Sequence, residues 1–330
     1  MKSVICFGEA LVDFLNTSKQ TEDLLVLNNY RQYPGGAPAN AAVAVAKLGG
    51  KAYFAGQVGK DIFGDFLMTA LKKYHVNTDF VAQHPNAKTP LAFVSLDDKG
   101  ERSFIFHRHQ TADILFNQDQ ISETWFIHEP LFHFCSNTLT DDHIAQCTNF
   151  AVKKALQFNC AISFDVNLRH NLWPDNRVDI DVVNQLVFKS HIIKFAKEEF
   201  EYLAQGDFSG YINQCLKANC QLIIITNGAK DICYYTKTTK GNITPPQVNA
   251  IDTTAGGDGF IGGVLFALSQ YLNLKNVNIK HIFKDTNKLN QIISFAAQCG
   301  AFAVTKPGAF PALPTKTDIS KAFSDLFLEH

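Results

Sequence analysis

The sequence has no excess charge of either sign, no long apolar run and no closely paired cysteines. Its 330 residues include 30 Lys and Arg against 31 Asp and Glu, which gives a formal net charge of −1. The global basic field that nucleic acid or an anionic membrane would require is therefore absent. The apolar stretches are short and interrupted, which argues against a membrane span. With 46% hydrophobic residues, the chain can instead bury the core of a globular protein.

Features of an exported or metal-stabilised protein are also missing. The eight cysteines are scattered, and no C-x-x-C pair occurs among them, so a zinc site and a disulfide framework lack support. The first residues, MKSVICFGEA, run into a strand-like stretch without the cleavage site of a signal peptide. We expect buried, reduced thiols in a cytoplasmic protein that acts on small molecules.

Apolar runs alternate with helical patterns along most of the chain. Four runs have the length and branching of strands covered on both faces, at residues 3–7, 161–165, 191–195 and 222–226. Helical spacing appears between such runs, at residues 39–50, 141–159 and 197–205. This alternation predicts an α/β fold with a mainly parallel sheet and crossover helices.

Two segments break this alternation. Residues 90–108 alternate with period two on both sides of residues 97–100, which is a hairpin signal, and residues 14–33 are also strand-like. If the two segments pair, they form a small sheet that covers a site. We therefore predict one main domain (residues 1–13, 34–89 and 110–330) with a small β-lid (residues 14–33 and 90–109).

The stretch IDTTAGGDGF, residues 251–260, places Asp258 directly behind small residues and before an apolar helical pattern. We interpret it as a helix start, with an ordinary glycine-rich loop as the alternative. Ala255, Gly256 and Gly257 would then present free amides, and the helix dipole would add positive charge, to a developing phosphate charge. Asp258 would accept the proton of a hydroxyl that attacks the phosphate.

The same stretch matches two other phosphate-binding patterns poorly. Gly257, Gly259 and Gly262 fit the G-x-G-x-x-G dinucleotide fingerprint, and Asp285 follows at a suitable distance. That fingerprint should directly follow an apolar strand, whereas here it follows a polar, Pro-containing segment. A G-x-x-x-x-G-K-[ST] loop occurs nowhere. A dehydrogenase is therefore a poorly supported alternative, and a P-loop enzyme is excluded.

The glycine stretch and eight further segments together resemble the PfkB, or ribokinase-like, family of sugar kinases. DTTAGGDGF is similar to the C-terminal signature of the family, and YPGGAPANAAVAVAKLGG, residues 33–50, is similar to its N-terminal signature. The others follow in family order: GEALVDF, GQVGKDIFG, AFVSLDDKGERSFIFHR, FDVNLRHNLW, KEEFEYL, TNGAKD and GAFPALP. The resemblance implies a ribokinase-like three-layer α/β/α fold with a β-lid, in agreement with the alternation.

The resemblance also implies roles at the reacting end of the site. Asp258 would be the general base that deprotonates a primary sugar hydroxyl, which then attacks the γ-phosphate of ATP. The amides of Ala255, Gly256 and Gly257 would form the anion hole, although the family usually has Gly where Ala255 stands.

On the sugar side, the resemblance implies five binding residues. Asp13 would hold sugar hydroxyls, while Gly35, Gly36 and Asn40 would line the same pocket. Arg108 would reach the sugar from the lid hairpin. Without the family match, the glycines would equally suit a tight turn and Asn40 the start of a helix.

For ATP, the resemblance places four residues near the phosphates and the nucleotide. Asn167 and Arg169 would lie near the transferred phosphate, where a guanidinium offsets charge, and Val166 stands where the family usually has Pro. Thr226 and Gly228 would approach the nucleotide from a strand end.

The resemblance further implies two cation sites. Glu199 would organise Mg²⁺ through water, although Ala196 replaces the Asn of the family's N-x-x-E motif. Asp252 and the carbonyl of Thr254 would belong to a monovalent-cation site that suits K⁺. ATP and Mg²⁺ are therefore the expected cofactors, because phosphoryl transfer needs the charge of ATP neutralised.

The segment GGAPAN favours a fructokinase-like member of the family, so we expect transfer to O6 of D-fructose. A riboside kinase, such as an aminoimidazole riboside kinase, and a ketodeoxygluconate kinase are the rival enzymes. A catalytically silent sugar-binding regulator is the rival from another class. We expect a homodimer that forms through the lid, because exposed lid strands tend to pair with another copy.

Overall fold

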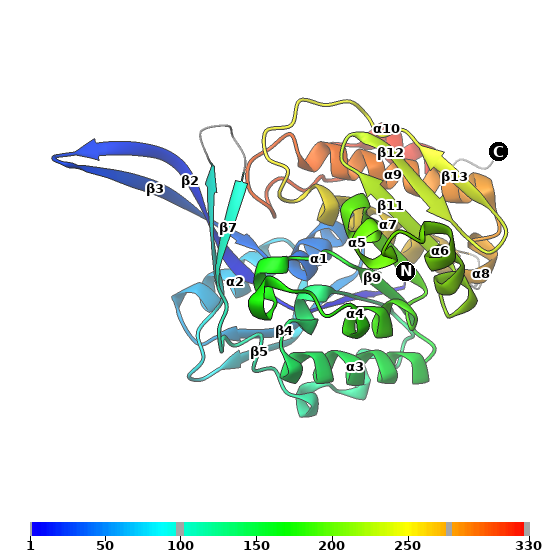
Figure 1. Ribbon diagram of the computed structural model, residues 1–330, viewed down its shortest axis with the longest axis horizontal. Helices are drawn as coiled ribbons and strands as arrows, with labels where there is room; N and C mark the ends of the chain where they lie inside the picture. Colours follow the sequence, from blue (N-terminus) through cyan, green and yellow to red (C-terminus); the bar gives the residue numbers. More distant parts are fainter. Residues whose placement is uncertain (1, 97–101, 275–278, 327–330) are drawn as a thin grey trace.

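A large, mostly parallel sheet between helices and a smaller separate sheet make up the fold (Figure 1). The computed structural model describes residues 2–96, 102–274 and 279–326. The large sheet has the strand order β13-β12-β11-β10-β9-β8-β1-β4-β5, and its strands from β11 to β5 are all parallel. The predicted α/β class is therefore confirmed.

The strands of the large sheet are short where they cross the centre of the molecule. They are β1 (Val4–Phe7), β4 (Ala52–Gly59), β5 (Asn77–His84), β8 (Leu131–Cys135), β9 (Ala161–Asp165), β10 (Ile192–Ala196), β11 (Leu222–Asn227), β12 (Lys230–Tyr235) and β13 (Lys240–Ile243). The last two are antiparallel additions at one edge. The four strands expected from apolar runs are β1, β9, β10 and β11.

Helices cover both faces of this sheet. They are α1 (Ala37–Lys47), α2 (Ile62–Lys73), α3 (Asp142–Gln157), α4 (Ile180–Val187), α5 (Lys197–Ala204), α6 (Phe208–Lys217), α7 (Gly256–Leu274), α8 (Ile279–Ile282), α9 (Thr286–Ala303) and α10 (Ser320–Asp325). In β1, Val4 and Cys6 join the core beneath α1, α7 and α9, while Ile5 and Phe7 join the core beneath α3 to α6. Burial on both faces explains why these strands read as continuous apolar runs.

Short 3₁₀ turns fill several connections between the strands and helices. They are η1 (Gln118–Gln120), η2 (Glu123–Trp125), η3 (Ser136–Leu139), η4 (His170–Leu172) and η5 (Pro174–Asn176). Two of them, η3 and η4, follow the carboxyl ends of β8 and β9, the edge at which parallel α/β sheets bind ligands.

The smaller sheet consists of β2 (Leu11–Glu22), β3 (Leu25–Gly35), β6 (Leu91–Leu96) and β7 (Arg102–His107). Its order is β3-β2-β6-β7, and the parallel pairing of β2 with β6 joins the two predicted lid segments. The predicted hairpin of residues 90–108 is present as β6 and β7, while its turn at residues 97–100 lies outside the described residues. The β2–β3 hairpin projects far from the body (Figure 1).

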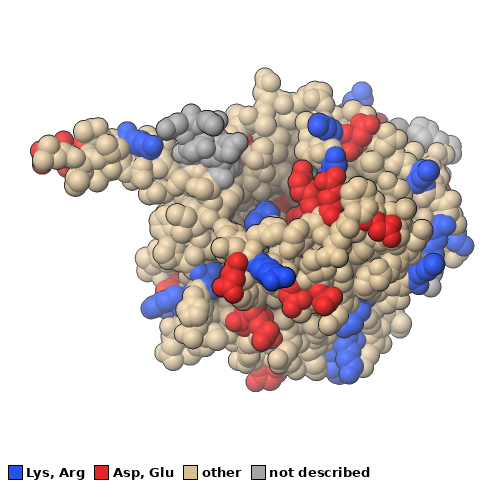
Figure 2. All heavy atoms as spheres, in the orientation of Figure 1, with Lys and Arg blue, Asp and Glu red and all other residues tan. Residues whose placement is uncertain are grey.

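The eight cysteines are free thiols, and all but the half-buried Cys233 are buried, as the sequence predicts. Among the described residues, no helix has the length and apolar character needed to cross a bilayer. Lys and Arg are interspersed with Asp and Glu on the face shown in Figure 2.

Glycines set the spacing of helix α7 from its neighbours. A Cβ at Gly262 would overlap Ala44 of α1, and a Cβ at Gly259 would lie 3.1 Å from Ala303 of α9. These glycines of the G-x-G-x-x-G pattern thus serve helix packing, and Asp285 caps α9 by accepting a hydrogen bond from the Lys288 amide. The pattern is not a dinucleotide-binding loop.

Gly262→Ala should destabilise the protein even though Ala favours a helix over Gly by about 1 kcal/mol. The added methyl group must push α7 away from α1, and such overpacking costs about 1–3 kcal/mol. Chemical denaturation should therefore show a lower free energy of unfolding. Gln270→Ala, on the same helix at a half-buried position, is the control and should show no such loss. An unchanged or higher stability of Gly262→Ala would contradict the proposed close packing.

Candidate active site

Asp258 lies in the first turn of α7 and faces a cavity of about 380 Å³. Its Oδ2 accepts a hydrogen bond of 2.7 Å from Asn40 Nδ2 on α1. The side chain lines the cavity although the residue is only 8% exposed. A carboxylate held in this way is desolvated and yet reachable, as a general base must be.

The cavity collects most of the residues that the sequence predicts for the phosphate end of the site. Those that line it are Asn167, Arg169, Glu199, Thr226, Gly228, Thr254, Gly256, Gly257 and Asp258. They come from the carboxyl ends of β9, β10 and β11 and from the start of α7. Seven other predicted residues do not line this cavity: Ala255 and Asp252, and the five of the predicted sugar side, Asp13, Gly35, Gly36, Asn40 and Arg108.

The start of α7 provides the predicted main-chain donors. The helix begins at Gly256, so the amides of its first turn lack partners within the helix. The Gly256 amide makes a long contact of 3.3 Å with the Thr253 carbonyl. Ala255 is fully buried just before the helix, where its methyl group is accommodated.

On the side of Asn40, a glycine pair lies close to the Asp13 carboxylate and to the main chain of Glu9. A Cβ at Gly35 would overlap the Asp13 carboxylate, and Gly36 has a φ of 101° with a Cβ position 2.5 Å from the Glu9 carbonyl oxygen. Only glycine fits both demands. The turn therefore positions Asp13 and the start of α1, which carries Asn40, beside each other.

Several carboxylates lie close together in this region, and both their burial and their mutual repulsion raise their pKa values. Burial raises the pKa of Asp13 to about 7, with further increases from the charges of Asp258, Asp252 and Glu9. Burial also raises the pKa of Asp258 to about 6, against the lowering effects of the Asn40 hydrogen bond and of the Lys194 and Arg169 charges. Asp258 is thus mostly ionised at neutral pH yet basic enough to take a proton.

Sequence reasoning missed Lys194, which is buried in β10 and lines the cavity. Its Nζ lies 3.0 Å from Asp165 Oδ1, at the end of β9. A Cβ placed on Gly257 would be only 3.2 Å from this ammonium, so the positive charge lies next to the helix start. The sequence does contain a signal for this residue, which is the lysine within the apolar run HIIKF. A strand that is buried on both faces rarely contains a charged residue unless a partner neutralises it.

Lys194 stays charged despite its burial. Burial alone would lower the pKa of its ammonium, but the carboxylates of Asp165, Glu199 and Asp258 outweigh that effect and raise the pKa above its usual value. A positive charge is therefore present in the cavity wall beside the start of α7.

Glu199 is held by two backbone amides. Its Oε2 accepts from the Ala196 amide at 2.7 Å, and its Oε1 accepts from the Leu168 amide at 2.9 Å. The carboxylate thus ties the start of α5 to the loop after β9, which contains Asn167 in a left-handed conformation with φ 41°. The Ala at position 196 leaves this bond intact because only its backbone takes part.

Asp252 joins two loops. Its Oδ1 accepts from the Thr254 amide, and its Oδ2 accepts from the Gly308 amide, both at 2.9 Å. The backbone of both loops is thereby held beside one carboxylate, and oxygen donors of this kind suit a hard cation. Among the described residues, no group of three or more His, Cys, Asp and Glu side chains could hold a metal by itself.

Arg108 is buried rather than exposed at the end of the lid strand β7. Its Nε donates to Asp113 Oδ2 at 2.6 Å, and its Nη1 donates to Thr140 Oγ1 at 3.1 Å. Burial of an ion pair requires such partners. The charges of Asp113 and Glu9 act on Arg108, so its guanidinium lies on the Glu9 side of the glycine turn.

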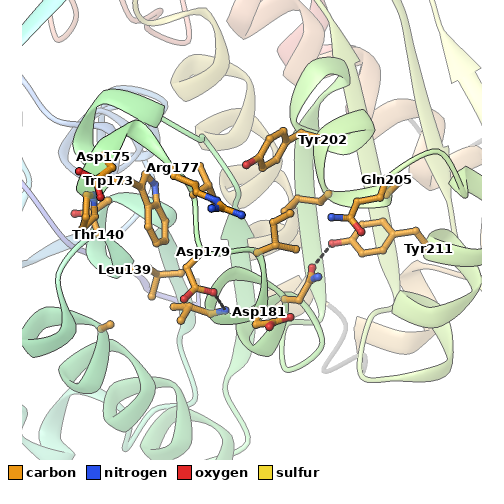
Figure 3. Close-up of a pocket in the computed structure, with 18 of the residues that line it drawn as sticks. Leu139, Thr140, Trp173, Asp175, Arg177, Asp179, Asp181, Tyr202, Gln205 and Tyr211 are labelled. Carbon is orange, nitrogen blue, oxygen red and sulfur yellow. Dashed lines mark hydrogen bonds between the residues drawn. The ribbon is translucent and has the colours of Figure 1, made fainter.

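A wider hollow of about 1220 Å³ between α3, α4 and α6 contains none of the predicted residues (Figure 3). Its acidic character has a structural cause. Asp141, Asp179 and Asp207 each accept a backbone hydrogen bond at the start of α3, α4 and α6 respectively. A role as helix caps thus accounts for these three of the aspartates in its wall.

Comparisons with known proteins agree with this geometry. The family model described as pfkB family carbohydrate kinase matches residues 1–316. "Probable fructokinase-5" of Arabidopsis thaliana is 36% identical over 320 residues, which cover 96% of each chain.

Two solved structures share the fold over nearly their whole length. The ATP-bound fructokinase of Xylella fastidiosa has a TM-score of 0.90 and 36% identity, with 98% of each chain covered. A double mutant of Vibrio cholerae O395 fructokinase, bound to fructose, ADP and a potassium ion, has a TM-score of 0.85 and 30% identity, with 99% of this chain and 98% of that chain covered. The family match over almost the entire sequence shows that the chain belongs to the pfkB family of carbohydrate kinases.

Proposed function

We propose that this protein is an ATP-dependent fructokinase that transfers the γ-phosphate of ATP to O6 of D-fructose and releases fructose 6-phosphate. One observation carries the proposal: the Asp258 carboxylate borders a cavity at the start of α7 and is hydrogen-bonded to Asn40. The fructokinases among the similar proteins support fructose as the sugar.

In the proposed mechanism, ionised Asp258 accepts the proton of the primary hydroxyl as the oxygen attacks the γ-phosphate. The first amides of α7 and the Lys194 ammonium stabilise the negative charge that the transferred group carries. Arg169, which also lines the cavity, adds a second positive charge from the loop after β9. Asp13, Gly35 and Gly36 bind the sugar ring on the opposite side of Asn40.

The remaining cavity wall suits a nucleotide. Thr226 and Gly228 lie where β11 ends, and the Thr226 hydroxyl donates to the Phe195 carbonyl at 3.2 Å, which keeps this strand end in place. Apolar residues of the loop after β13 and of α9 continue the wall: Pro245, Pro246, Val248, Ala250, Ala297 and Val304. We assign this apolar part to adenine, since nucleobase sites are mostly apolar with a few polar groups.

We assign Mg²⁺ to the phosphate end and K⁺ to the Asp252 loops. Mg²⁺ usually binds through one or two carboxylates, water and substrate phosphates, which fits Glu199 in the cavity wall. The ion would neutralise the phosphate charge of ATP. For K⁺, Asp252 and the Thr254 carbonyl supply oxygen donors, and the fructokinase from V. cholerae O395 has a potassium-bound form.

A reducing compartment, the cytoplasm, is the location we propose. Eight free thiols would be at risk of oxidation in an exported protein, whereas the cytosol keeps them reduced.

An ADP-release assay over fructose, ribose, ketodeoxygluconate and ribosides tests the sugar. Fructose should give the highest kcat/KM. Turnover of a riboside or of ketodeoxygluconate without turnover of fructose would instead favour one of the rival kinases, and binding of fructose without any ADP release would favour the silent regulator.

Asp258→Asn should lower turnover by roughly two to four orders of magnitude, because the amide cannot accept the proton. Folding should not suffer. Since burial raises the pKa of Asp258 from about 4 to about 6, its ionisation costs stability as pH rises through this range, and at pH 8 the full cost is present. The amide avoids this cost and can still accept the Asn40 hydrogen bond. Thermal denaturation at pH 8 should thus show equal or greater stability, and undiminished turnover would reject Asp258 as the base.

In a plot of kcat/KM against pH, the acidic limb should have its midpoint near pH 6, because Asp258 becomes protonated there. Lys194→Met removes a positive charge that lowers this pKa, so the limb should move to higher pH. Lys154→Met, which breaks the exposed ion pair with Glu123, is the control and should leave the limb in place.

Lys194→Met alone leaves Asp165 buried without its partner, which can cost about 3–5 kcal/mol. The double variant Lys194→Met, Asp165→Asn removes both charges and serves if the single variant does not fold. Its maximal rate should remain low because the charge beside the anion hole is absent. A wild-type rate and pH limb in a folded Lys194 variant would exclude this lysine from the mechanism.

We further infer that two copies of the chain pair through their lids. The β2–β3 hairpin exposes a run of apolar side chains, from Leu24 at 92% exposure through Leu25, Val26 and Leu27 to Tyr30. Few charged residues cover the hairpin in Figure 2. Such a surface is costly in water unless a partner covers it, and β3 is an edge strand that can accept one.

Light scattering should give twice the mass of the chain for the wild type. The double variant Leu25→Lys, Val26→Lys should dissociate it, because two charges would be desolvated at the interface. Ile62→Lys alters an exposed apolar residue on α2, outside the lid, and should keep the dimer. A monomeric wild type would contradict the inferred pairing.

A further inference from the structure

Three buried polar atoms without a hydrogen-bond partner lie around the carboxyl ends of β1, β8 and β9 and the start of α1. They are Asn40 Oδ1, Asn137 Oδ1 and Arg108 Nη2. Buried polar atoms in folded proteins almost always have a partner, so each such atom indicates a bound molecule or an ordered water. Asn40 belongs to the site already described, but Asn137 has no role assigned so far.

Asn137 lies between two segments of the proposed substrate site. Its Nδ2 donates to Glu9 Oε1 at 2.9 Å, and the same oxygen accepts from the Ala37 amide, directly after the glycine pair. On the other side, the neighbouring Ser136 donates to the Asn167 carbonyl at 3.2 Å. Asn137 is therefore fixed beside the glycine turn, with one side-chain amide hydrogen bonded to Glu9 and its side-chain oxygen Oδ1 unused.

Arg108 is fixed next to Asn137. The Thr140 hydroxyl accepts from Arg108 Nη1 at 3.1 Å and donates to the Asn137 carbonyl at 3.0 Å. Asp113 holds the guanidinium from another side. In this network, Arg108 Nη2 is an unused donor and Asn137 Oδ1 is an unused acceptor.

A sugar hydroxyl can satisfy both atoms, because it accepts from one group and donates to another. The chain of contacts runs from Asp258 through Asn40 and α1 to the glycine turn, then through Glu9 to Asn137 and Arg108. The two unused atoms are thus connected to the Asp258 carboxylate through the glycine turn rather than in direct contact with it. A sugar that presents its primary hydroxyl to Asp258 directs its other end toward them.

We propose that Asn137 Oδ1 and Arg108 Nη2 together bind the hydroxyl groups at the end of the sugar remote from the phosphorylated oxygen, and that Asn137 is a specificity-determining residue. This proposal rests on the proposed function, in which the sugar is fructose and its O6 reacts. The remote hydroxyls are then those on C1 and C2. Recognition at this end favours a ketohexose over a smaller sugar that lacks these groups.

The test compares fructose with 1-deoxy-D-fructose and with 2,5-anhydro-D-mannitol, which lack the C1 and C2 hydroxyls respectively. In the wild type, at least one of these analogues should have a kcat/KM about tenfold or more below that of fructose, since it leaves buried groups unpaired. Asn137→Ala should lower kcat/KM for fructose by a similar factor, mainly through KM. The variant should then discriminate between fructose and that analogue by less than about twofold, because the effects of two groups in contact are not additive.

Ser136→Ala is the matched control. Ser136 lies in the same turn and is fully buried, but its hydroxyl is already paired with the Asn167 carbonyl. A variant that merely disturbs the turn should weaken turnover of all sugars equally, so Ser136→Ala should keep the wild-type discrimination. Asn137→Leu is a second variant of nearly the same size; it also removes the acceptor and serves as the test if the alanine variant does not fold.

Equal discrimination in the wild type and in a folded Asn137 variant would overturn the proposal and assign the unused atoms to ordered water. Equal turnover of fructose and both analogues by the wild type would overturn it as well. Failure of the proposed function would look different: the wild type would then not phosphorylate fructose at all. In that case the same comparison of wild type and Asn137→Ala, made with the sugar that is phosphorylated and with its deoxy analogues, decides the role of Asn137.

Discussion

The hydrogen bond between Asn40 and Asp258 is the contact on which the proposed site depends, because it joins the helix that we assign to the sugar side with the helix that we assign to the phosphate side. It links the first turns of α1 and α7, and these helices pack closely where Gly262 meets Ala44. Since the helices are held by the core beneath them, the carboxylate has little freedom to turn away from the cavity. The backbone amides at the start of α7 keep the same fixed relation to it. Positioning of this kind lowers the cost of bringing reacting groups together.

The second constraint is electrostatic. Asp13, Asp165 and Asp258 are buried in one region. The buried ammonium of Lys194 interacts with the carboxylates of Asp165 and Asp258. Burial of several charged groups lowers the stability of the folded state, and such groups are concentrated at functional sites. Burial makes Asp258 a stronger base than an exposed aspartate, while Lys194 and Arg169 keep it ionised at neutral pH. Lys194 and Arg169, whose charges lower the pKa of Asp258 against the effect of burial, also line the cavity in which a phosphate group would bind.

Much of this arrangement could be predicted from the sequence where local pattern and structure agree. The run at Ala161–Asp165 becomes β9 with the predicted bounds, because a doubly covered strand is apolar throughout and ends where a charge appears. The helix start before Asp258 was predicted from small residues followed by an apolar helical pattern, and α7 confirms it. Lys194 was missed, since one charge in an apolar run does not reveal that Asp165, far away in sequence, is its partner.

The buried network of Glu9, Arg108 and Asn137 could not be predicted either. Its members come from the ends of different strands and touch only after the sheet forms, so no spacing along the chain reports them. Likewise, a period-two pattern indicates strands in the lid, but it does not show how far the β2–β3 hairpin extends beyond the body (Figure 1).

A crystal structure with fructose and a non-hydrolysable ATP analogue is the most direct measurement of the central claim. In this complex, the sugar's primary hydroxyl should lie within hydrogen-bond distance, about 3 Å, of the Asp258 carboxylate and face the γ-phosphate at the start of α7. A sugar bound elsewhere, or bound there with its primary hydroxyl directed away from Asp258, would contradict it.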